Sequence, residues 1–440
     1  MRFTAILPCL LAAIALELAG VARAQDVPEE TLGAKFQTTY VWQRKYPFGA
    51  AYSGPNSLTP DREKSYSFTA TAALGARLWR GGEVYVDPEA TQGVPLSHLT
   101  GLGGFTNGEI ARTSGPELTL YAARAFLRQT WGLGGEREKV ESDANQLAGS
   151  ADRRRIVLTA GKLSVQDLFD DNAYSHDPRT QFLNWSLMTY GAWDFAADAR
   201  GYSWGIALEY FHDTWALRAA RFMMPKQSNG LALNPRIFES FGDQIELEHS
   251  HSIGGQAGKL RLLAFRNQAD MGGYSDSLAD AAASGATPDL ATSRKKRVKY
   301  GFGVNLEQSF SPDIGMFARA SWNNGEAETF AFTEIDRSIS VGTVVKGSGW
   351  KRPDDSLGIA FVRNGISGPH SDYLGAGGLG VFLGDGRLNY RSENIFETYY
   401  SAGLFKDAWL SADFQRIFDP AYNADRGPVS VASARFHYGF

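Results

Sequence analysis

Long segments of the chain alternate between apolar and polar residues with a period of two. In residues 65–79, SYSFTATAALGARLW, aromatic and aliphatic side chains occupy the even positions, and small or polar side chains occupy most odd positions. The segment 201–210, GYSWGIALEY, repeats the pattern with Tyr202 and Trp204 on the apolar side, and 297–308, RVKYGFGVNLEQ, repeats it again. Because side chains alternate between the two faces of a β-strand, each segment predicts a strand with one apolar and one polar face.

The same pattern, read along the whole chain, predicts sixteen strands. We expect them near 33–44, 65–79, 83–91, 117–130, 155–163, 200–210, 213–222, 241–251, 257–267, 297–309, 314–322, 337–346, 355–363, 390–403, 407–417 and 429–440.

Many of these strands are longer than those of a soluble sandwich, which have about five or six residues. A tilted strand of about 9 to 11 residues crosses the hydrocarbon layer of an outer membrane. The short links 80–82, 211–213 and 311–313 fall on one side of the sheet, and the long links fall on the other. The pattern therefore predicts an all-β fold: a 16-stranded antiparallel transmembrane β-barrel with long extracellular loops, some of them folded inward.

The N-terminus has the features of a secretory signal peptide. Arg2 supplies a positive charge, residues 3–16 are mostly apolar, and Ala-Arg-Ala at 22–24 is a small-x-small cleavage site. An anchoring helix is the alternative, but it needs about 20 apolar residues. We therefore expect a signal peptide at 1–24 and a single barrel domain at 25–440, in the outer membrane of a Gram-negative bacterium.

Composition removes further classes of function. Cys9 is the only cysteine and lies in the predicted signal peptide, so no disulfide or cysteine nucleophile is expected in the mature chain. The formal net charge is −4 with scattered Lys and Arg, which excludes nucleic acid as an expected partner. Aromatic residues make up 12% of the chain and glycine occurs 48 times, as expected for many strands and tight turns.

The C-terminus reads as the closing strand of the barrel. Phe436, Tyr438 and Phe440 alternate with Arg435 and His437, so the three aromatic side chains share one face. We expect this face to contact outer-membrane lipid. A terminal Phe resembles the signal by which the barrel assembly machinery recognises bacterial outer-membrane barrels, and that machinery is therefore an expected partner.

Sixteen strands enclose an aqueous channel, so the lumen-facing residues decide what passes. The alternation assigns both signs of charge to the lumen, together with some aromatic side chains. On the fourth strand its parity is ambiguous, and we place Arg124 and Arg128 in the lumen because they share a face and each would cost about 2 to 4 kcal/mol at the middle of the lipid layer. The predicted channel-lining residues on the wall are Arg77, Tyr85, Asp87, Glu89, Arg124, Arg128, Glu393 and Glu397, and Arg218, Glu246, Glu248, Arg261, Arg319, Asp413, Gln415 and Arg435 share their parity. Mixed charge with aromatic rings favours neutral, hydroxyl-rich solutes. The alternative is that these charges hydrate the lumen and brace one another.

Five segments are similar to the carbohydrate-selective porin family of the OprB type. They are PEATQGVPLSHLTGLGGFTNGE (88–109), RAFLRQTWGLGGE (124–136), AGKLSVQDLFDDNAYSHDPRTQFLNWSLM (160–188), YLGAGGLGVFLGDGRLNY (373–390) and DPAYNADRGPVSV (419–431). The resemblance runs from about residue 65 to the C-terminus. It implies a sixteen-stranded channel, working as a monomer, for passive diffusion of neutral monosaccharides such as glucose, with sugar uptake through a constriction built by inward-folded loops.

Carried onto this chain, the resemblance predicts inward loops at 92–116 and 164–199. Candidate sugar contacts in the second loop are Asp170, Asp171, Arg179 and Trp185, combined with Arg77, Glu89, Arg124 and Arg128 from the wall. The alternative is a self-bonded loop in which Asp and Asn side chains cap short turns and Arg179 pairs with Asp171.

Three other interpretations remain open. The channel could carry small organic acids or other non-sugar solutes, or the external loops could bind a partner. A hydrolase is disfavoured because no Gly-x-Ser-x-Gly elbow is found between a predicted strand and a helix, and we expect no enzyme and no cofactor. His249 and His251 share one face of a predicted strand, but two imidazoles alone do not make a metal site, and none is expected.

The segment 133–154 departs from the pattern, because it is a long polar stretch on the periplasmic side. It ends in Arg153, Arg154 and Arg155, which read as a solvated charge run. Composition leaves two possibilities for the segment, an ordered turn or a flexible insertion.

Overall fold

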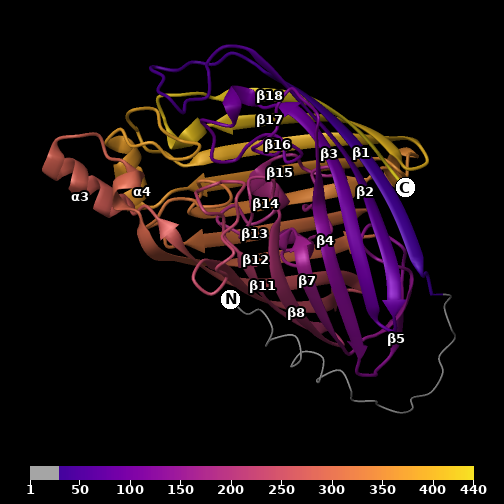
Figure 1. Cartoon of the computed structure of the whole chain (residues 1–440). Helices are drawn as coiled ribbons and strands as arrows, with labels where there is room; N and C mark the ends of the chain where they lie inside the picture. The colour runs from indigo at the N-terminus through magenta and orange to yellow at the C-terminus, as the bar shows by residue number, and fades with distance from the viewer. Residues whose placement is uncertain (1–28) are drawn as a thin grey trace.

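The computed structural model describes residues 29–440, and these form one closed barrel (Figure 1). The predicted signal peptide at 1–24 lies outside the described residues, and its removal stays a prediction. Each barrel strand pairs antiparallel with its neighbours, and the first strand pairs with the last, Tyr40 opposite Phe436. The expected sixteen strands are confirmed, because every one of them is present close to its predicted position.

The barrel strands differ from the expected ranges by only a few residues at each end. They are β1 (Leu32–Lys45), β2 (Glu63–Trp79), β3 (Gly82–Val94), β4 (Thr119–Gly132), β7 (Arg155–Leu163), β8 (Ser203–His212), β9 (Trp215–Met223), β10 (Phe241–Ile253), β11 (Gln256–Met271), β12 (Lys295–Ser311), β13 (Ile314–Asn323), β14 (Arg337–Lys346), β15 (Ser356–Gly365), β16 (Glu393–Phe405), β17 (Ala408–Phe418) and β18 (Val429–Gly439). A separate two-stranded sheet consists of β5 (Arg137–Val140) and β6 (Gly149–Asp152).

The period of two separates a lipid face from a lumen face. Leu74, Leu208 and Phe302 are about half exposed on the outside, whereas their polar neighbours Thr71 and Asn305 are buried inside. Phe436 of β18 and Phe440, which follows the strand directly, are exposed, as the alternation predicts. The wall therefore has an apolar exterior and a polar interior.

Two positions show where alternation alone is insufficient. Tyr202 lies just before β8 begins and points inward, with only 7% of its surface exposed, so its predicted place on the lipid face is wrong. In β4 a bulge opposite Asp87 and Pro88 shifts the alternation by one residue. As a result, Tyr121 before the bulge and Arg124 and Arg128 after it all face the lumen.

Long and short connections lie at opposite ends of the barrel. Most strand pairs are joined by two-residue turns at one end, such as 80–81 and 213–214, which we assign to the periplasm. The other end carries the long loops. These hold α2 (Trp185–Met188), α3 (Tyr274–Ser284), α4 (Gly368–Gly375) and the 3-10 helices η2 (Leu96–His98), η3 (Val165–Asp167), η4 (Leu290–Ser293) and η6 (Pro420–Tyr422), while η5 (Gly347–Trp350) lies in a periplasmic turn.

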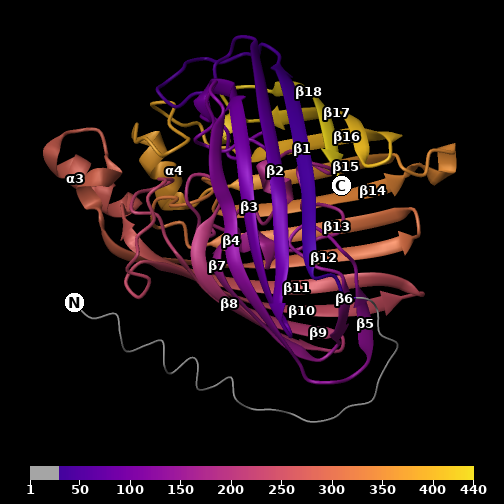
Figure 2. The same cartoon turned by 45° about the vertical axis from the view of Figure 1, so that its right-hand side comes forward.

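Figures 1 and 2 show α3 and α4 at the extracellular end and β5 at the periplasmic end. No helix within residues 29–440 is both long enough and apolar enough to cross a membrane.

Extracellular loops fold into the barrel and pack against each other. Phe105 of the 95–118 loop meets Trp185 of the 164–202 loop edge to face at 5.2 Å, and Trp185 stacks on Phe332 at 5.4 Å. Phe182 packs against the wall residue Tyr399 of β16 at 4.9 Å. Aromatic contacts of this kind add to the free energy gained by burying the rings. The loops are thus a packed unit with its own apolar core.

Candidate functional site

Buried carboxylates of the wall hold the inward loops. Glu393 of β16 accepts hydrogen bonds from the backbone N–H groups of Gly103 and Gly104, at 3.0 and 2.8 Å. Further along β16, on the same face, Glu397 accepts hydrogen bonds from the backbone N–H groups of Leu183 and Asn184. Loop backbone buried in a barrel has no water to bond with, so it needs acceptors from the wall. These two glutamates supply them.

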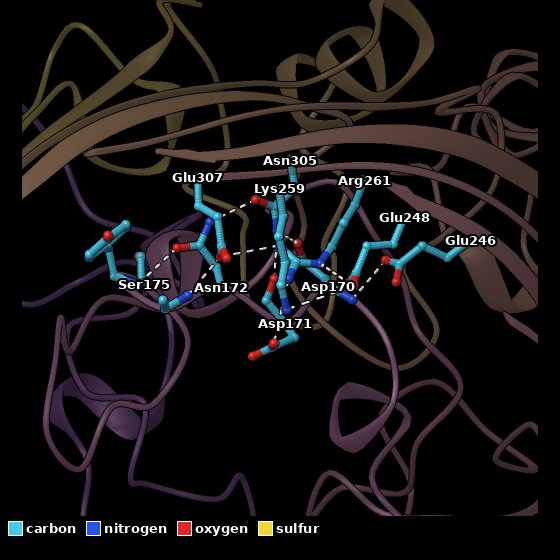
Figure 3. A network of polar contacts seen from close by, with 12 residues as sticks. Asp170, Asp171, Asn172, Ser175, Glu246, Glu248, Lys259, Arg261, Asn305 and Glu307 are labelled. Atoms are coloured by element: carbon cyan, nitrogen blue, oxygen red, sulfur yellow. Dashed lines mark hydrogen bonds and ion pairs between the residues drawn. The ribbon is translucent and has the colours of Figure 1, made fainter. Parts of the chain in front are cut away.

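A polar network joins the 164–202 loop to the opposite wall (Figure 3). The backbone N–H of Asp170 donates to Glu246 at 2.8 Å, and that of Ala173 donates to Glu307 at the same distance. Arg261 lies between Glu248 and Glu307, at 2.7 and 3.2 Å, and reaches Asp171 at 3.5 Å. The network therefore fixes the start of this loop on β10, β11 and β12.

A cavity of about 1630 Å³ occupies the periplasmic half of the lumen. Its lining comes mainly from β1–β4, the 133–154 segment and the ends of β8 and β9. Of the predicted channel-lining residues, it includes Arg77, Asp87, Arg124, Arg128, Asp171 and Arg179. The cavity thus borders the strands from β1 to β9, and the extracellular half of the lumen is filled by the loop unit.

Arg179 marks the inner end of this cavity. Its Nε donates to Glu109 at 2.8 Å, and its Nη2 lies 3.4 Å from Glu89. Glu89 also accepts hydrogen bonds from Thr71 at 2.7 Å and from the hydroxyls of Tyr121 and Tyr202. Loop and wall therefore meet here through one guanidinium and two carboxylates.

Arg124 adds a second guanidinium beside the first. It donates two hydrogen bonds to Asp167 of η3, at 2.6 and 2.7 Å, and lies 3.4 Å from Asp87 of the wall. Its guanidinium carbon lies 5.3 Å from the ring centre of Tyr202. On the same rings, Arg200 lies 4.3 Å from Tyr121 and Lys162 lies 5.8 Å from Tyr202. We call Glu89, Glu109, Tyr121, Arg124, Lys162, Asp167, Arg179, Arg200 and Tyr202 the constriction cluster.

Comparison with known proteins identifies the family and the fold of the chain. Residues 56–440 match the model of the carbohydrate-selective porin family, OprB type. The chain belongs to this family. It is therefore a carbohydrate-selective porin of the Gram-negative outer membrane, and its family and fold are those of channels rather than enzymes.

Solved structures show the same architecture at low identity. The high-pH structure of Pseudomonas putida OprB is 16% identical, with a TM-score of 0.70, over 93% of this chain and 94% of that one. The low-pH structure of the same protein is 14% identical with a TM-score of 0.49, over 93% of each chain. The outer membrane channel DcaP of Acinetobacter baumannii is 10% identical, also with a TM-score of 0.49, over 93% of this chain and 97% of that one. The curated proteins contain no match.

Four predicted channel-lining residues of the porin do not line the channel. Asp170 is fully buried and pairs with Arg319 at 2.9 Å. Trp185 lies in the aromatic loop core and donates from Nε1 to the backbone of Asn107. Glu393 and Glu397 are fully buried beneath the loops. For these four the prediction is wrong, because inward-facing side chains in this half of the lumen meet folded loop instead of water.

Two other predicted channel-lining residues, Tyr85 and Glu89, are buried behind the side chains that line the cavity. Tyr85 is buried, donates to Glu83 at 2.8 Å and accepts from the backbone of Leu147. Glu89 has an exposed fraction of only 3% and lies behind Arg179 and the two tyrosines. Tyr85 braces the wall, whereas Glu89 sets the charge of the constriction cluster. The predicted pairing of Arg179 with Asp171 is absent from the ion pairs of the described residues, because Arg179 turns toward Glu89 and Glu109 instead.

Sequence reasoning missed six members of the constriction cluster, among them Asp167 of η3, which pairs with Arg124. Tyr121 and Tyr202 were obscured by the bulge in β4 and by the inward turn before β8. Glu109 lies in the predicted inward loop, but nothing local distinguishes it from other loop acids. Lys162 and Arg200 lie at the end of β7 and shortly before β8. Only the pairing of β4, β7 and β8 brings these residues together.

Burial and charge set the protonation of the loop residues in the cluster. Burial raises the pKa of the Glu109 carboxyl, although the Arg179 guanidinium opposes the rise. Burial alone would lower the pKa of Arg179, but the charges of Glu109 and Glu89 outweigh it and raise that pKa. Arg179 therefore stays charged, and Glu109 is the member of this pair that takes up a proton more readily.

The two histidines of β10 contact other side chains and are not arranged as metal ligands. His249 stacks on Trp215 at 4.2 Å, and His251 bonds to Gln308 at 3.1 Å. Among residues 29–440 no group of three or more His, Cys, Asp or Glu side chains is arranged to hold a metal ion.

Proposed function

We propose that this porin is a monomeric channel for passive diffusion of neutral monosaccharides, with glucose as the model solute, and that the constriction cluster is its sugar contact. The observation that carries the proposal is the arrangement around the Tyr202 ring: Arg124 lies over the ring, the Tyr202 hydroxyl donates to Glu89, and Arg179 pairs with Glu89. Donors, acceptors and an aromatic face together match the hydroxyls and C–H faces of a sugar.

The cluster is suited to transient binding. A sugar entering from outside would exchange water for hydrogen bonds to guanidinium and carboxylate groups while resting on a tyrosine ring. The two central guanidiniums already have charged partners, Asp167 for Arg124 and Glu109 for Arg179. The solute therefore competes with existing ion pairs, which keeps its binding weak and its exit fast.

The charges of the cluster favour a neutral solute. The guanidiniums of Arg124 and Arg179 face the carboxylates of Glu89, Glu109 and Asp167 within a few ångströms. A field of mixed sign attracts neither ion strongly. Small organic acids are the second candidate, because Lys162, Arg200 and Arg124 gather around the two tyrosine rings. Three cations in one place would attract a small carboxylate.

Further partners belong to the same proposal. The exposed apolar band of the wall would contact outer-membrane lipid, with side chains such as Leu208 and Phe302. The terminal residue Phe440 pairs through its backbone with Phe36 of β1, next to the closing seam. We propose that Phe436, Tyr438 and Phe440 form the signal read by the barrel assembly machinery.

Ion current through the purified porin in a planar bilayer tests the proposal. We expect weak ion selectivity and concentration-dependent block by glucose, with less block by a small carboxylate such as acetate. Arg179→Ala is the informative variant, and Lys259→Ala on the opposite wall is its matched control. A current that glucose leaves unchanged would remove the sugar assignment, and stronger block by acetate than by glucose would favour the second candidate.

A further inference from the structure

The 133–154 segment is an ordered hairpin, which decides between the two possibilities that composition left open. It joins β4 to β7, two strands that pair directly from Ala125 opposite Lys162 to Gly132 opposite Arg155. Most other strand pairs at this end are joined by two-residue turns. The segment instead forms its own sheet, with β5 paired to β6 from Arg137 opposite Asp152. It lies at the periplasmic end of the barrel (Figure 2).

The tip of the hairpin enters the lumen and is fixed there by polar contacts. Arg128 donates to the backbone carbonyl of Asn145 at 2.8 Å. The Asn145 side chain donates to Asp87 at 2.9 Å, and the backbone N–H of Leu147 donates to the Tyr85 hydroxyl at 3.2 Å. The inward charges of β3 and β4 therefore bind the hairpin tip.

An apolar contact holds the same tip against the neighbouring strands β1 and β2. Leu147 has an exposed fraction of only 4% and lies over Gly33 of β1 and Gly75 of β2, which are paired in the sheet. A Cβ atom at residue 33 would lie 2.7 Å from Leu147 Cδ2, closer than such atoms approach. The two glycines thus form a notch that any larger side chain at position 33 would fill.

Backbone contacts to the first strand complete the attachment. The backbone N–H of Ala148 donates to the Glu30 carboxylate at 2.8 Å, and the backbone N–H of Glu30 donates back to Ala148 at 3.0 Å. Arg77 donates to the same Ala148 carbonyl at 3.3 Å. A tip tied to β1, β2, β3 and β4 at once behaves as a fixed part of the lumen wall rather than as a mobile flap.

The hairpin forms one side of the exit. The cavity of about 1630 Å³ is lined by the hairpin residues 142–147 and 149–152, and also by Glu209, Phe211 and Arg218 of β8 and β9. The tip also touches the constriction cluster indirectly, because Asp87 bonds to both Asn145 and Arg124. Solute that passes the cluster and enters this cavity therefore moves past the hairpin residues that line it.

We propose that the hairpin 133–154 is a second filter, in series with the constriction cluster, that limits the size of solute leaving toward the periplasm. The proposal rests on the porin function but not on which solute binds at the cluster. A charged and amide-bearing wall would slow a disaccharide more than a monosaccharide, because the wider solute must displace more bound water and contacts both sides of the exit.

Removing the hairpin is the most direct test. Replacing 133–154 by Asn-Gly would join β4 and β7 through a two-residue turn of the type favoured in hairpins. We expect single-channel conductance to rise about twofold and the swelling rate of porin-containing liposomes in sucrose, relative to glucose, to rise about threefold or more. Conductance and sucrose-to-glucose ratio both equal to those of the intact porin would overturn the proposal.

Point variants test the same idea with the hairpin present. Gly33→Leu fills the notch and Leu147→Ser removes the apolar anchor, so both should release the tip and raise the sucrose-to-glucose ratio in the same direction as excision. Lys139→Ala is the matched control, because Lys139 is exposed on the hairpin and pairs only with exposed Glu141. If the excised porin fails to fold, unchanged ratios in both point variants still overturn the proposal.

The outcomes separate this proposal from the sugar assignment. Glucose block in the intact porin with no effect of any hairpin variant would retain the constriction cluster and remove the second filter. No glucose block, but a wider size limit after excision, would retain the filter and remove the sugar contact.

Discussion

The two sides of the lumen contain the same types of charged residue and use them differently. Beneath the loops, Asp170, Arg319 and Glu393 have side chains that are at most 2% exposed and bond only to protein. Along the passage, the side chains of Arg124 and Arg179 keep 17% and 23% of their surface exposed. Covered charges hold the loops in place, and partly exposed charges remain able to exchange partners with solute.

The physical reason for the difference is the cost of burial. A buried charge or backbone polar group without a partner is expensive, so Asp170 pairs with an arginine, and Glu393 and Glu397 accept hydrogen bonds from loop backbone. A partly exposed guanidinium retains some water, and replacing that water by a sugar hydroxyl costs little. Coverage by loops, rather than residue type, therefore decides which lumen charges are structural.

The largest effect on stability is expected when a charge covered by the loops loses its partner. Asp170→Ala leaves Arg319 buried without its partner, and we expect unfolding free energy to fall by about 3 to 5 kcal/mol. Urea denaturation followed by tryptophan fluorescence measures this loss. Asp171→Ala is the control, because the Asp171 side chain is 63% exposed and should contribute less than about 1 kcal/mol. Equal losses in the two variants would contradict the division between covered and exposed charges.

A smaller loss is expected when a fastening carboxylate is removed. Glu393→Ala leaves the backbone N–H groups of Gly103 and Gly104 without an acceptor, which costs about 1 to 3 kcal/mol. Glu393→Gln keeps one acceptor oxygen and should recover part of this loss. Current recordings should show more open-channel noise for the alanine variant, because the loop unit is less firmly held. Noise as low as in the intact porin would indicate that Glu393 is not a fastener.

In the exposed half, function should change more than stability. Arg179→Ala leaves Glu89 and Glu109 facing each other without a cation, so we expect cation selectivity to rise and glucose block to weaken about tenfold, close to 1.4 kcal/mol. Reversal potentials across a salt gradient and glucose titrations of the current measure the two effects. Arg179→Lys should keep the ion selectivity and lose part of the block, since one ammonium cannot bridge two carboxylates as a guanidinium does.

Removing the Tyr202 ring of the constriction cluster should weaken glucose block less than removing Arg179. Tyr202→Ala removes the surface on which a sugar would rest, and we expect glucose block to weaken about threefold, or 0.5 to 1 kcal/mol. Tyr202→Phe loses only the hydroxyl that bonds to Glu89 at 3.3 Å. Block by Tyr202→Phe should stay close to that of the intact porin, and a larger loss there than in Tyr202→Ala would assign the effect to the hydroxyl.

The smallest effect concerns the extracellular helix α3. Hydrogen bonds from Lys295 and Arg297 lower the pKa of exposed Asp276 to about 2. Because the folded pKa is lowered, the stabilisation is present above the ordinary pKa of about 3.9 and is lost as the pH falls toward 2. The difference in Tm between the intact porin and Asp276→Asn should therefore be seen at pH 6 and vanish near pH 2. A difference that is the same at both pH values would exclude this pair of hydrogen bonds as its source.

The sequence by itself determined the barrel. Strand number, closing strand, lipid face and loop side all follow from a period of two, because every spanning strand must present apolar atoms to lipid and polar atoms to the lumen. The five motifs indicated the family for the same local reason, since each is a continuous run of residues.

Only the tertiary structure decided which inward residues line the passage. Glu393 and Arg124 have the same inward parity, yet a loop covers one and leaves the other accessible to water. Tyr202 and Glu109 reach the constriction cluster through chain turns that have no periodic signature. The hairpin enters the lumen because Leu147 fits a notch between Gly33 and Gly75, residues far away along the chain. Contacts of this kind depend on three-dimensional fit and burial, which no local pattern records.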